Sequence, residues 1–188
     1  MDALMAALVA ALLTQASDRT PWAVALLGDR FASNKGTVIA ATALAIALGN
    51  AIGVAGGMLI APALSPNARD LLLALALVSG GVTAFWPIKR AKPNGARGGT
   101  FLITLMTVGL LGFGDRLQFI TAALATRSAT PALAAVGATI GALAVIVPAI
   151  LLGDGKLRRL PTDALRLIAA ALLTVAGVVQ GLGALRLI

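Results

Sequence analysis

The chain has 188 residues and a net charge of +8, with 59% of its residues hydrophobic and only 12% charged. Soluble domains carry about 25% charged residues, so this composition excludes an ordinary soluble fold, and it is too apolar for a disordered chain. Cysteine and histidine are absent, which excludes disulfides, thiol nucleophiles and imidazole ligands. The basic residues lie mainly between apolar runs, which favours membrane lipids over nucleic acid as partners.

Six apolar segments follow one another along the chain. They cover residues 3–28, 37–61, 70–88, 100–126, 131–153 and 164–187. Each is close to the roughly 20 residues that a helix needs to cross a bilayer, and lipid offers no hydrogen bonds to an open backbone. We therefore predict an all-α membrane protein with six transmembrane helices, forming a single transmembrane domain over residues 1–188.

The loops between these segments differ in charge. Nine basic residues lie in the first, third and fifth loops, whereas only Arg69, Arg127 and Arg186 lie on the other side. Because loops rich in lysine and arginine stay in the cytoplasm, the central basic loop is predicted to be cytoplasmic and both termini periplasmic. The abundance of arginine and alanine suggests a bacterial source, so we expect a multi-pass protein of the bacterial inner (plasma) membrane.

The two halves of the chain repeat each other at an offset of 97 residues, which relates Asp18-Arg19 to Asp115-Arg116. Three helices per half is an odd number, so the two copies must face opposite sides of the membrane. This is the inverted-topology plan of many secondary transporters. We predict repeat one over residues 1–88, a cytoplasmic linker over 89–99 and repeat two over 100–188.

Charged residues inside apolar segments mark the candidate site. Each charge at the centre of a membrane helix costs roughly 2.5–3.5 kcal/mol, so Asp18, Arg19, Asp115 and Arg116 suggest a function. The alternative is that they only hold the bundle together. Since neighbours on a helix do not face each other, Asp18 would then pair with Arg116, and Asp115 with Arg19.

Neutral polar residues accompany both charged pairs. Gln15 and Ser17 lie near Asp18, and Pro21 cannot donate a helical hydrogen bond, so a carbonyl near Ser17 should be free in a broken helix. In the fourth segment, steps of three and four residues place on one helix face Thr104, Thr107, Asp115, Gln118 and Thr121. Such oxygen atoms are the ligands that hard cations prefer.

Other features suggest packing. Glycines recur at four-residue steps, which is typical of close helix packing in membranes: Gly49, Gly53 and Gly57, then Gly137 and Gly141, then Gly177 and Gly181. The isolated amides Asn50 and Gln180 fit hydrogen bonds between helices at least as well as a substrate site. Asp29 repeats the Gly-Asp-Arg pattern but ends its segment, and we interpret it as an interfacial loop charge.

At these residues the chain resembles the GDT-type cation/proton exchangers. This family includes Golgi and chloroplast manganese/calcium transporters and bacterial manganese exporters. Its motif, Glu-x-Gly-Asp-Lys/Arg-Thr/Ser, occurs once in each three-helix half. Here the copies read Gln15-Ala-Ser-Asp18-Arg19-Thr20 and Gly112-Phe-Gly-Asp115-Arg116-Leu117. The aspartates and the bases match, whereas Gln15 and Gly112 replace the glutamates and Leu117 replaces the hydroxyl residue.

The resemblance implies a secondary transporter, not an enzyme, that exchanges Mn²⁺ or Ca²⁺ for protons and holds no resident cofactor. It implies that Asp18 and Asp115 are the metal ligands and proton carriers, and that Arg19 and Arg116 tune their charge. The implied neutral oxygen donors are Gln15, Ser17, Thr20, Thr107 and Gln118.

Two alternatives stay open because loss of the glutamates leaves the site with no net charge. One is a degenerate family member that no longer transports and acts as a membrane interaction or regulatory protein. The other is a transporter of a different ion or of a small solute. The oligomeric state also stays open, with a homodimer as one option.

Overall fold

The computed structural model describes residues 2–87 and 98–187, and every regular element in this part of the chain is helical. Most of the predicted linker 89–99 lies outside the described residues. The α-helices are α1 (Asp2–Ala16), α2 (Thr20–Arg30), α3 (Lys35–Ile60), α4 (Pro66–Ala84), α5 (Thr100–Gly112), α6 (Arg116–Arg127), α7 (Ala132–Leu157) and α8 (Thr162–Ala184). Short 3-10 turns precede α3 (Ala32–Asn34) and follow it (Ala61–Ala63).

The predicted segments agree with the helices in four cases and differ in two. α3, α4, α7 and α8 match their predicted segments to within a few residues at most ends. The first and fourth segments are instead each two helices separated by a break. The same order of helices therefore occurs twice, α1 to α4 and then α5 to α8, and α3 and α7 are each 26 residues long.

Fewer helices than predicted are long and apolar enough to cross a bilayer alone. In the described part of the chain these are 32–63, 132–157 and 162–184, and the pair α5–α6, bent by 65°, would add a fourth. α1 is apolar but has only 15 residues. A count of six spans therefore requires α1 and α2 to act together as one broken span and α4 to be another.

The first break follows from proline chemistry, as the sequence predicted. α1 ends at Ala16, and Pro21 lies in the first turn of α2, where its missing N–H does no harm. The proline ring excludes a helical carbonyl four residues earlier, at Ser17. Asp18 binds the start of α2: its Oδ2 accepts hydrogen bonds from Thr20 N at 3.2 Å and from Thr20 Oγ1 at 2.6 Å.

The second break depends on glycine. Gly114 has a φ of +72°, a conformation that side chains with a Cβ rarely adopt, and it turns the chain between α5 and α6. Asp115 then forms the N-cap of α6. The single continuous helix face predicted for Thr104, Thr107 and Gln118 is wrong, because Thr104 and Thr107 belong to α5 whereas Gln118 belongs to α6.

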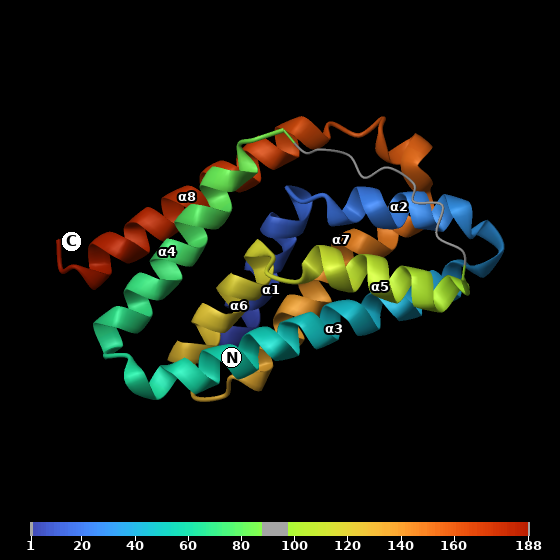
Figure 1. Cartoon of the computed structure of the whole chain (residues 1–188). Coiled ribbons are helices and arrows are strands. Elements are labelled where there is room, and N and C mark those ends of the chain that lie inside the picture. Colours follow the sequence, from blue (N-terminus) through green and yellow to red (C-terminus); the bar gives the residue numbers. More distant parts are fainter. Residues whose placement is uncertain (1, 88–97, 188) are drawn as a thin grey trace.

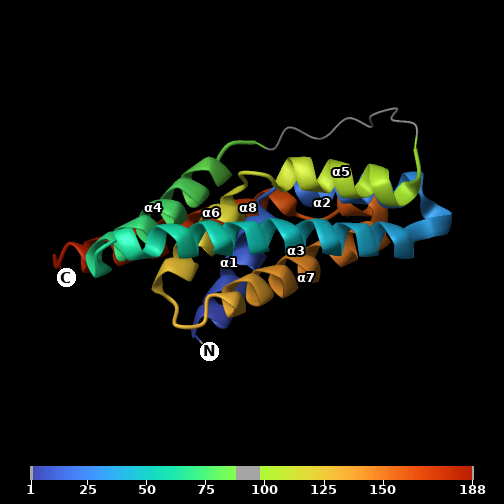
Figure 2. The same ribbon diagram turned by 60° about the horizontal axis from the view of Figure 1, so that its bottom comes forward.

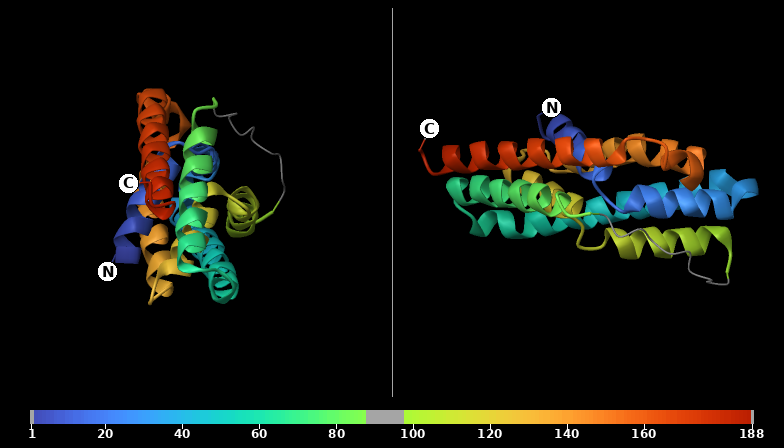
Figure 3. Two further views of the ribbon diagram at one scale, coloured as in Figure 1. Left: turned by 90° about the vertical axis from the view of Figure 1, so that its left-hand side faces the viewer. Right: turned by 90° about the horizontal axis from the view of Figure 1, so that it is seen from above.

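The helices form an elongated bundle (Figure 3). α4 and α8 pack side by side, and α3 and α7 extend along the rest of the bundle (Figure 1). α1 and α2 pack on α7, whereas α6 and α5 pack on α3 (Figure 2). We call one end of the bundle the terminal end; there α4 begins, and α6 and α8 finish (Figure 1). We call the other end the basic end; there α2 finishes, and α3 and α5 begin.

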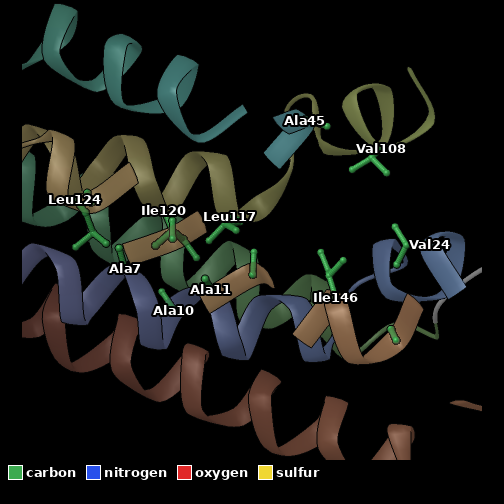
Figure 4. Packing of buried hydrophobic residues seen from close by; sticks show 14 of the residues in the cluster. Ala7, Ala10, Ala11, Val24, Ala45, Val108, Leu117, Ile120, Leu124 and Ile146 are labelled. Atoms are coloured by element: carbon green, nitrogen blue, oxygen red, sulfur yellow. The ribbon is translucent and has the colours of Figure 1, made fainter. Parts of the chain in front are cut away.

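The buried interior of the bundle consists largely of small residues. Alanines dominate the buried core, with larger side chains such as Leu117, Ile120 and Ile146 between them (Figure 4). Large apolar side chains instead face outward, among them Leu59 at 81% exposure and Leu110 at 76%. Water would penalise such a surface, whereas lipid tails solvate it, so the apolar exterior fits a membrane protein.

The predicted glycine packing is confirmed at most positions. A Cβ atom added at Gly53 or Gly57 of α3 would overlap the backbone of α6, and one at Gly137 or Gly141 of α7 would overlap the backbone of α1. Gly177 similarly packs on α4. Gly49 differs, because no atom lies within 4 Å of its added Cβ.

Two adjacent glycines of α3 give a direct test of this packing. A Cβ at Gly57 would collide with the carbonyl oxygen of Ala122, so Gly57→Ala should separate α3 from α6 and cost about 1–3 kcal/mol. Gly56→Ala is the matched control, since nothing lies within 4 Å of its Cβ, and alanine favours a helix by about 1 kcal/mol. Thermal unfolding in detergent should show a lower Tm for the first variant only. Equal Tm values would contradict the packing.

Candidate functional site

The two helix breaks come together in the middle of the bundle. Arg116, the first residue of α6, places its Nη2 atom 3.3 Å from Oδ1 of Asp18. The side chain of Asp18 is 10% exposed and that of Arg116 is 20% exposed. Asp18 therefore pairs with Arg116 across the two halves, which is the contact expected if these charges hold the bundle together.

Arg116 also binds two backbone carbonyls, one of them left free by the first break. Its Nη2 donates to the carbonyl oxygen of Ser17 at 2.9 Å, and its Nη1 donates to the carbonyl oxygen of Gly80 in α4 at 3.3 Å. One guanidinium thus joins the first break, α4 and α6. The free carbonyl expected near Ser17 exists, but in this structure it binds Arg116.

The second expected pair does not form. No ion pair joins Asp115 to Arg19 in the described part of the chain, and Arg19 is exposed. Asp115 instead caps its own helix, where its Oδ1 accepts a hydrogen bond from Arg116 N at 2.5 Å. Among the described residues nothing donates to its Oδ2. Asp18, Arg116 and Arg19 are the charged groups near enough to Asp115 to interact with it electrostatically.

A cavity of about 300 Å³ lies beside the second break. Its polar lining consists of Gln15, Thr20, Asn50, Asp115 and Gln118. Its remaining walls are apolar side chains and glycines, chiefly from α3 and α5. The cavity therefore brings together polar groups from α1, α2, α3 and α6.

Gln15 has the least satisfied polar atom of this lining. Its side chain is 4% exposed, yet its Oε1 atom has no hydrogen-bond partner among the described residues. A buried acceptor without a partner is costly and calls for a donor, a water molecule or a cation at that point. Gln15, whose Oε1 lacks a partner among the described residues, therefore lines the same cavity as the carboxylate of Asp115.

The other predicted oxygen donors are placed differently. Ser17 Oγ donates to the Thr14 carbonyl at 2.9 Å, and Thr20 Oγ1 donates to the carboxylate of Asp18. Thr107 is half-buried on α5 and does not line the cavity. Gln118 lines it, but its Oε1 accepts from Gly114 N at 2.7 Å and its Nε2 donates to the Gly49 carbonyl at 2.9 Å. Gln118 therefore fixes the second break against α3.

Asn50 is a cavity residue that sequence reasoning did not place at the site. Its Nδ2 donates to Thr139 Oγ1 at 3.1 Å, which is the helix-to-helix hydrogen bond that the sequence suggested. The same side chain, 3% exposed, also lines the cavity. The sequence feature that could have placed it at the site is its position between Gly49 and Gly53, on a helix face made of small residues.

Asp29 lies outside the site, as predicted, but it is more than a loop charge. It belongs to the last turn of α2, and its Oδ2 accepts a hydrogen bond from Asp154 N at 2.8 Å. At that point Gly153, with a φ of +74°, interrupts α7. Asp29 therefore anchors α2 to the kink of α7.

The cavity offers a cation a single acidic side chain among the described residues, that of Asp115. No cluster of three or more acidic, histidine or cysteine side chains occurs in residues 2–87 and 98–187. A cation in the cavity would meet one carboxylate oxygen, from Asp115, and neutral oxygens such as Gln15 Oε1. Because ligand charge sets the affinity of oxygen sites, such a site binds weakly.

Comparison with known proteins gave one result. A family model described as "Divalent cation/proton antiporter GDT1" matches residues 3–92 and 100–186, which is nearly the whole chain. No significant match was found among curated proteins or among solved structures.

Proposed function

The chain belongs to the GDT1 family of divalent cation/proton antiporters, and we propose that it exchanges Mn²⁺ or Ca²⁺ for protons at the cavity between its two helix breaks. Both ions prefer oxygen ligands, and the polar lining of this cavity supplies such oxygens from Asp115, Gln15 and Thr20. The single observation that carries the proposal is that Asp115 and Gln15 line one cavity, where Oε1 of Gln15 has no hydrogen-bond partner among the described residues.

The two aspartates have different roles in this proposal. Asp115 carries the exchange, because one carboxylate can hold either a proton or a cation, so that binding of one releases the other. Asp18 is neutralised by Arg116 and hydrogen-bonded by Thr20, so it reaches an ion only after Arg116 moves away. With a single available carboxylate, affinity should lie near the weak end of calcium sites, about 10⁻⁴–10⁻³ M.

The membrane arrangement follows the inverted-repeat prediction. Each broken pair, α1–α2 and α5–α6, forms one span, and α3, α4, α7 and α8 form the other four. Two features support this: the same order of helices occurs twice, and Arg30, Lys35, Lys156 and Arg158 gather at the basic end. The basic end then faces the cytoplasm of a bacterium and both termini face the periplasm.

Uptake into proteoliposomes tests this function. Purified protein should take up Mn²⁺ or Ca²⁺ when a pH gradient is imposed, and a protonophore that collapses the gradient should stop the uptake. Absence of flux for both ions from correctly folded protein would contradict the proposal. It would favour the non-transporting alternative or another substrate, since Gln15 and Gly112 replace the two glutamates of the family motif.

A further inference from the structure

The two halves of the chain make unequal contacts at the two ends of the bundle. At the terminal end, α1 packs on α8, and α6 packs on α4. In the repeat, α2 corresponds to α6 and α5 corresponds to α1. At the basic end α2 makes no comparable contact with α8, and α5 makes none with α4 (Figure 1). The bundle is therefore more tightly closed at the terminal end.

An ion pair strengthens the closed end. Asp70, in α4, places Oδ1 2.7 Å from Nε of Arg127, the last residue of α6. The repeat counterpart of Arg127 is Arg30, at the end of α2, but the counterpart of Asp70 is Leu167 in α8. The residue-for-residue counterpart of this pair is therefore missing from the other end.

A second cavity lies beside this ion pair. It has a volume of about 490 Å³ and is lined by residues of α1, α4, α6 and α8, including Leu73, Leu124, Arg127 and Gln180. Leu117, Ile120 and Leu124 of α6 pack with the alanines of α1 (Figure 4). Leu117 lines the first cavity and Leu124 lines the second, so apolar side chains of α6 lie between the two.

We propose that Asp70 and Arg127 form a latch that holds the terminal end closed while the candidate site is reached from the basic end. This inference rests on the proposed transport function. Both side chains are about one third exposed, at 32% and 36%, so the link is weak and can break when α6 moves away from α4. Opening would join the second cavity to the site and give an ion its exit or entry path.

The absence of cysteine allows a direct measurement of latch opening. Leu73→Cys places one thiol on the wall of the second cavity, where Leu73 is only 5% exposed. The rate at which a water-soluble maleimide labels this thiol in the solubilised protein then measures how often the reagent reaches the cavity wall. Adding Asp70→Asn or Arg127→Gln should speed the labelling several-fold. The exchanged pair, Asp70→Arg with Arg127→Asp, should return it towards the starting rate, and Asp163→Asn should leave it unchanged.

Labelling separates the latch from the transport proposal because it needs no ion flux. Faster labelling in both single variants with recovery in the exchanged pair supports the latch, even if no flux is measured. Unchanged labelling in the single variants would overturn the latch and leave the exchange mechanism intact. Failure of the exchanged pair to slow the labelling would also overturn it, because the contact would not then depend on opposite charges.

Discussion

Asp115→Asn is expected to abolish pH-driven Mn²⁺ and Ca²⁺ uptake while the protein still folds and inserts. The amide keeps an oxygen on the cavity but can neither carry the proton nor supply the negative charge, so both halves of the exchange are lost. The N-cap of α6 is kept, because asparagine caps helices about as well as aspartate. Uptake into proteoliposomes with an imposed pH gradient measures the effect.

The control for this change is Asp163→Asn, which makes the same substitution at a side chain that is 91% exposed. Its flux should equal that of the unchanged protein. Gel filtration of the Asp115→Asn protein should give the same monodisperse peak. Retained flux in Asp115→Asn would mean that the exchanged proton is carried elsewhere, with Asp18 as the remaining acidic group at the breaks.

Arg116→Gln is expected to produce the largest loss of stability. It leaves the carboxylate of Asp18 buried without its cation, and removing one partner of a buried ion pair costs about 3–5 kcal/mol. It also removes the hydrogen bonds that Arg116 donates to the carbonyls of Ser17 and Gly80, of which the Gly80 carbonyl keeps the one from Thr83 Oγ1. Thermal unfolding in detergent should show a strongly lowered Tm, whereas Arg159→Gln, at an exposed position, should change it little.

A second variant identifies the cause of this loss. Asp18→Asn combined with Arg116→Gln removes the unpaired charge, so the double variant should be more stable than Arg116→Gln alone. If the double variant unfolds at the same temperature as the single one, the backbone hydrogen bonds of Arg116 carry its effect and the ion pair contributes little.

The sequence predicted the long helices and one of the two breaks. Apolar runs located α3, α7 and α8, and Pro21 indicated the first break because its ring excludes a helical carbonyl. The second break was missed because glycine is common inside membrane helices, so Gly112 and Gly114 gave no clear signal. The positive φ of Gly114 depends on packing, in particular on the hydrogen bonds of Gln118.

The arrangement of the site was also predicted only in part from the sequence. The offset of the two Asp-Arg pairs predicted that the two pairs would meet, and the contact of Asp18 with Arg116 is the one expected if these charges hold the bundle together. The same symmetry also predicted a pair between Asp115 and Arg19, which failed because the two breaks are chemically different. Thr20 bonds to Asp18 at the first break, whereas Leu117 holds the matching position at the second, and Asp115 caps its own helix. The cavity with Asn50 depends on how α3 and α5 pack, which no local pattern encodes.

Exchange at Asp115 can be measured as proton release when a cation binds. When Mn²⁺ or Ca²⁺ is added to the solubilised protein in weak buffer with a pH indicator, displacement of the Asp115 proton should release protons in a saturable manner. K⁺ should release none, and the Asp115→Asn protein should not respond to any of these ions. Saturable cation binding without proton release, or equal release from the Asp115→Asn protein, would contradict exchange at this carboxylate.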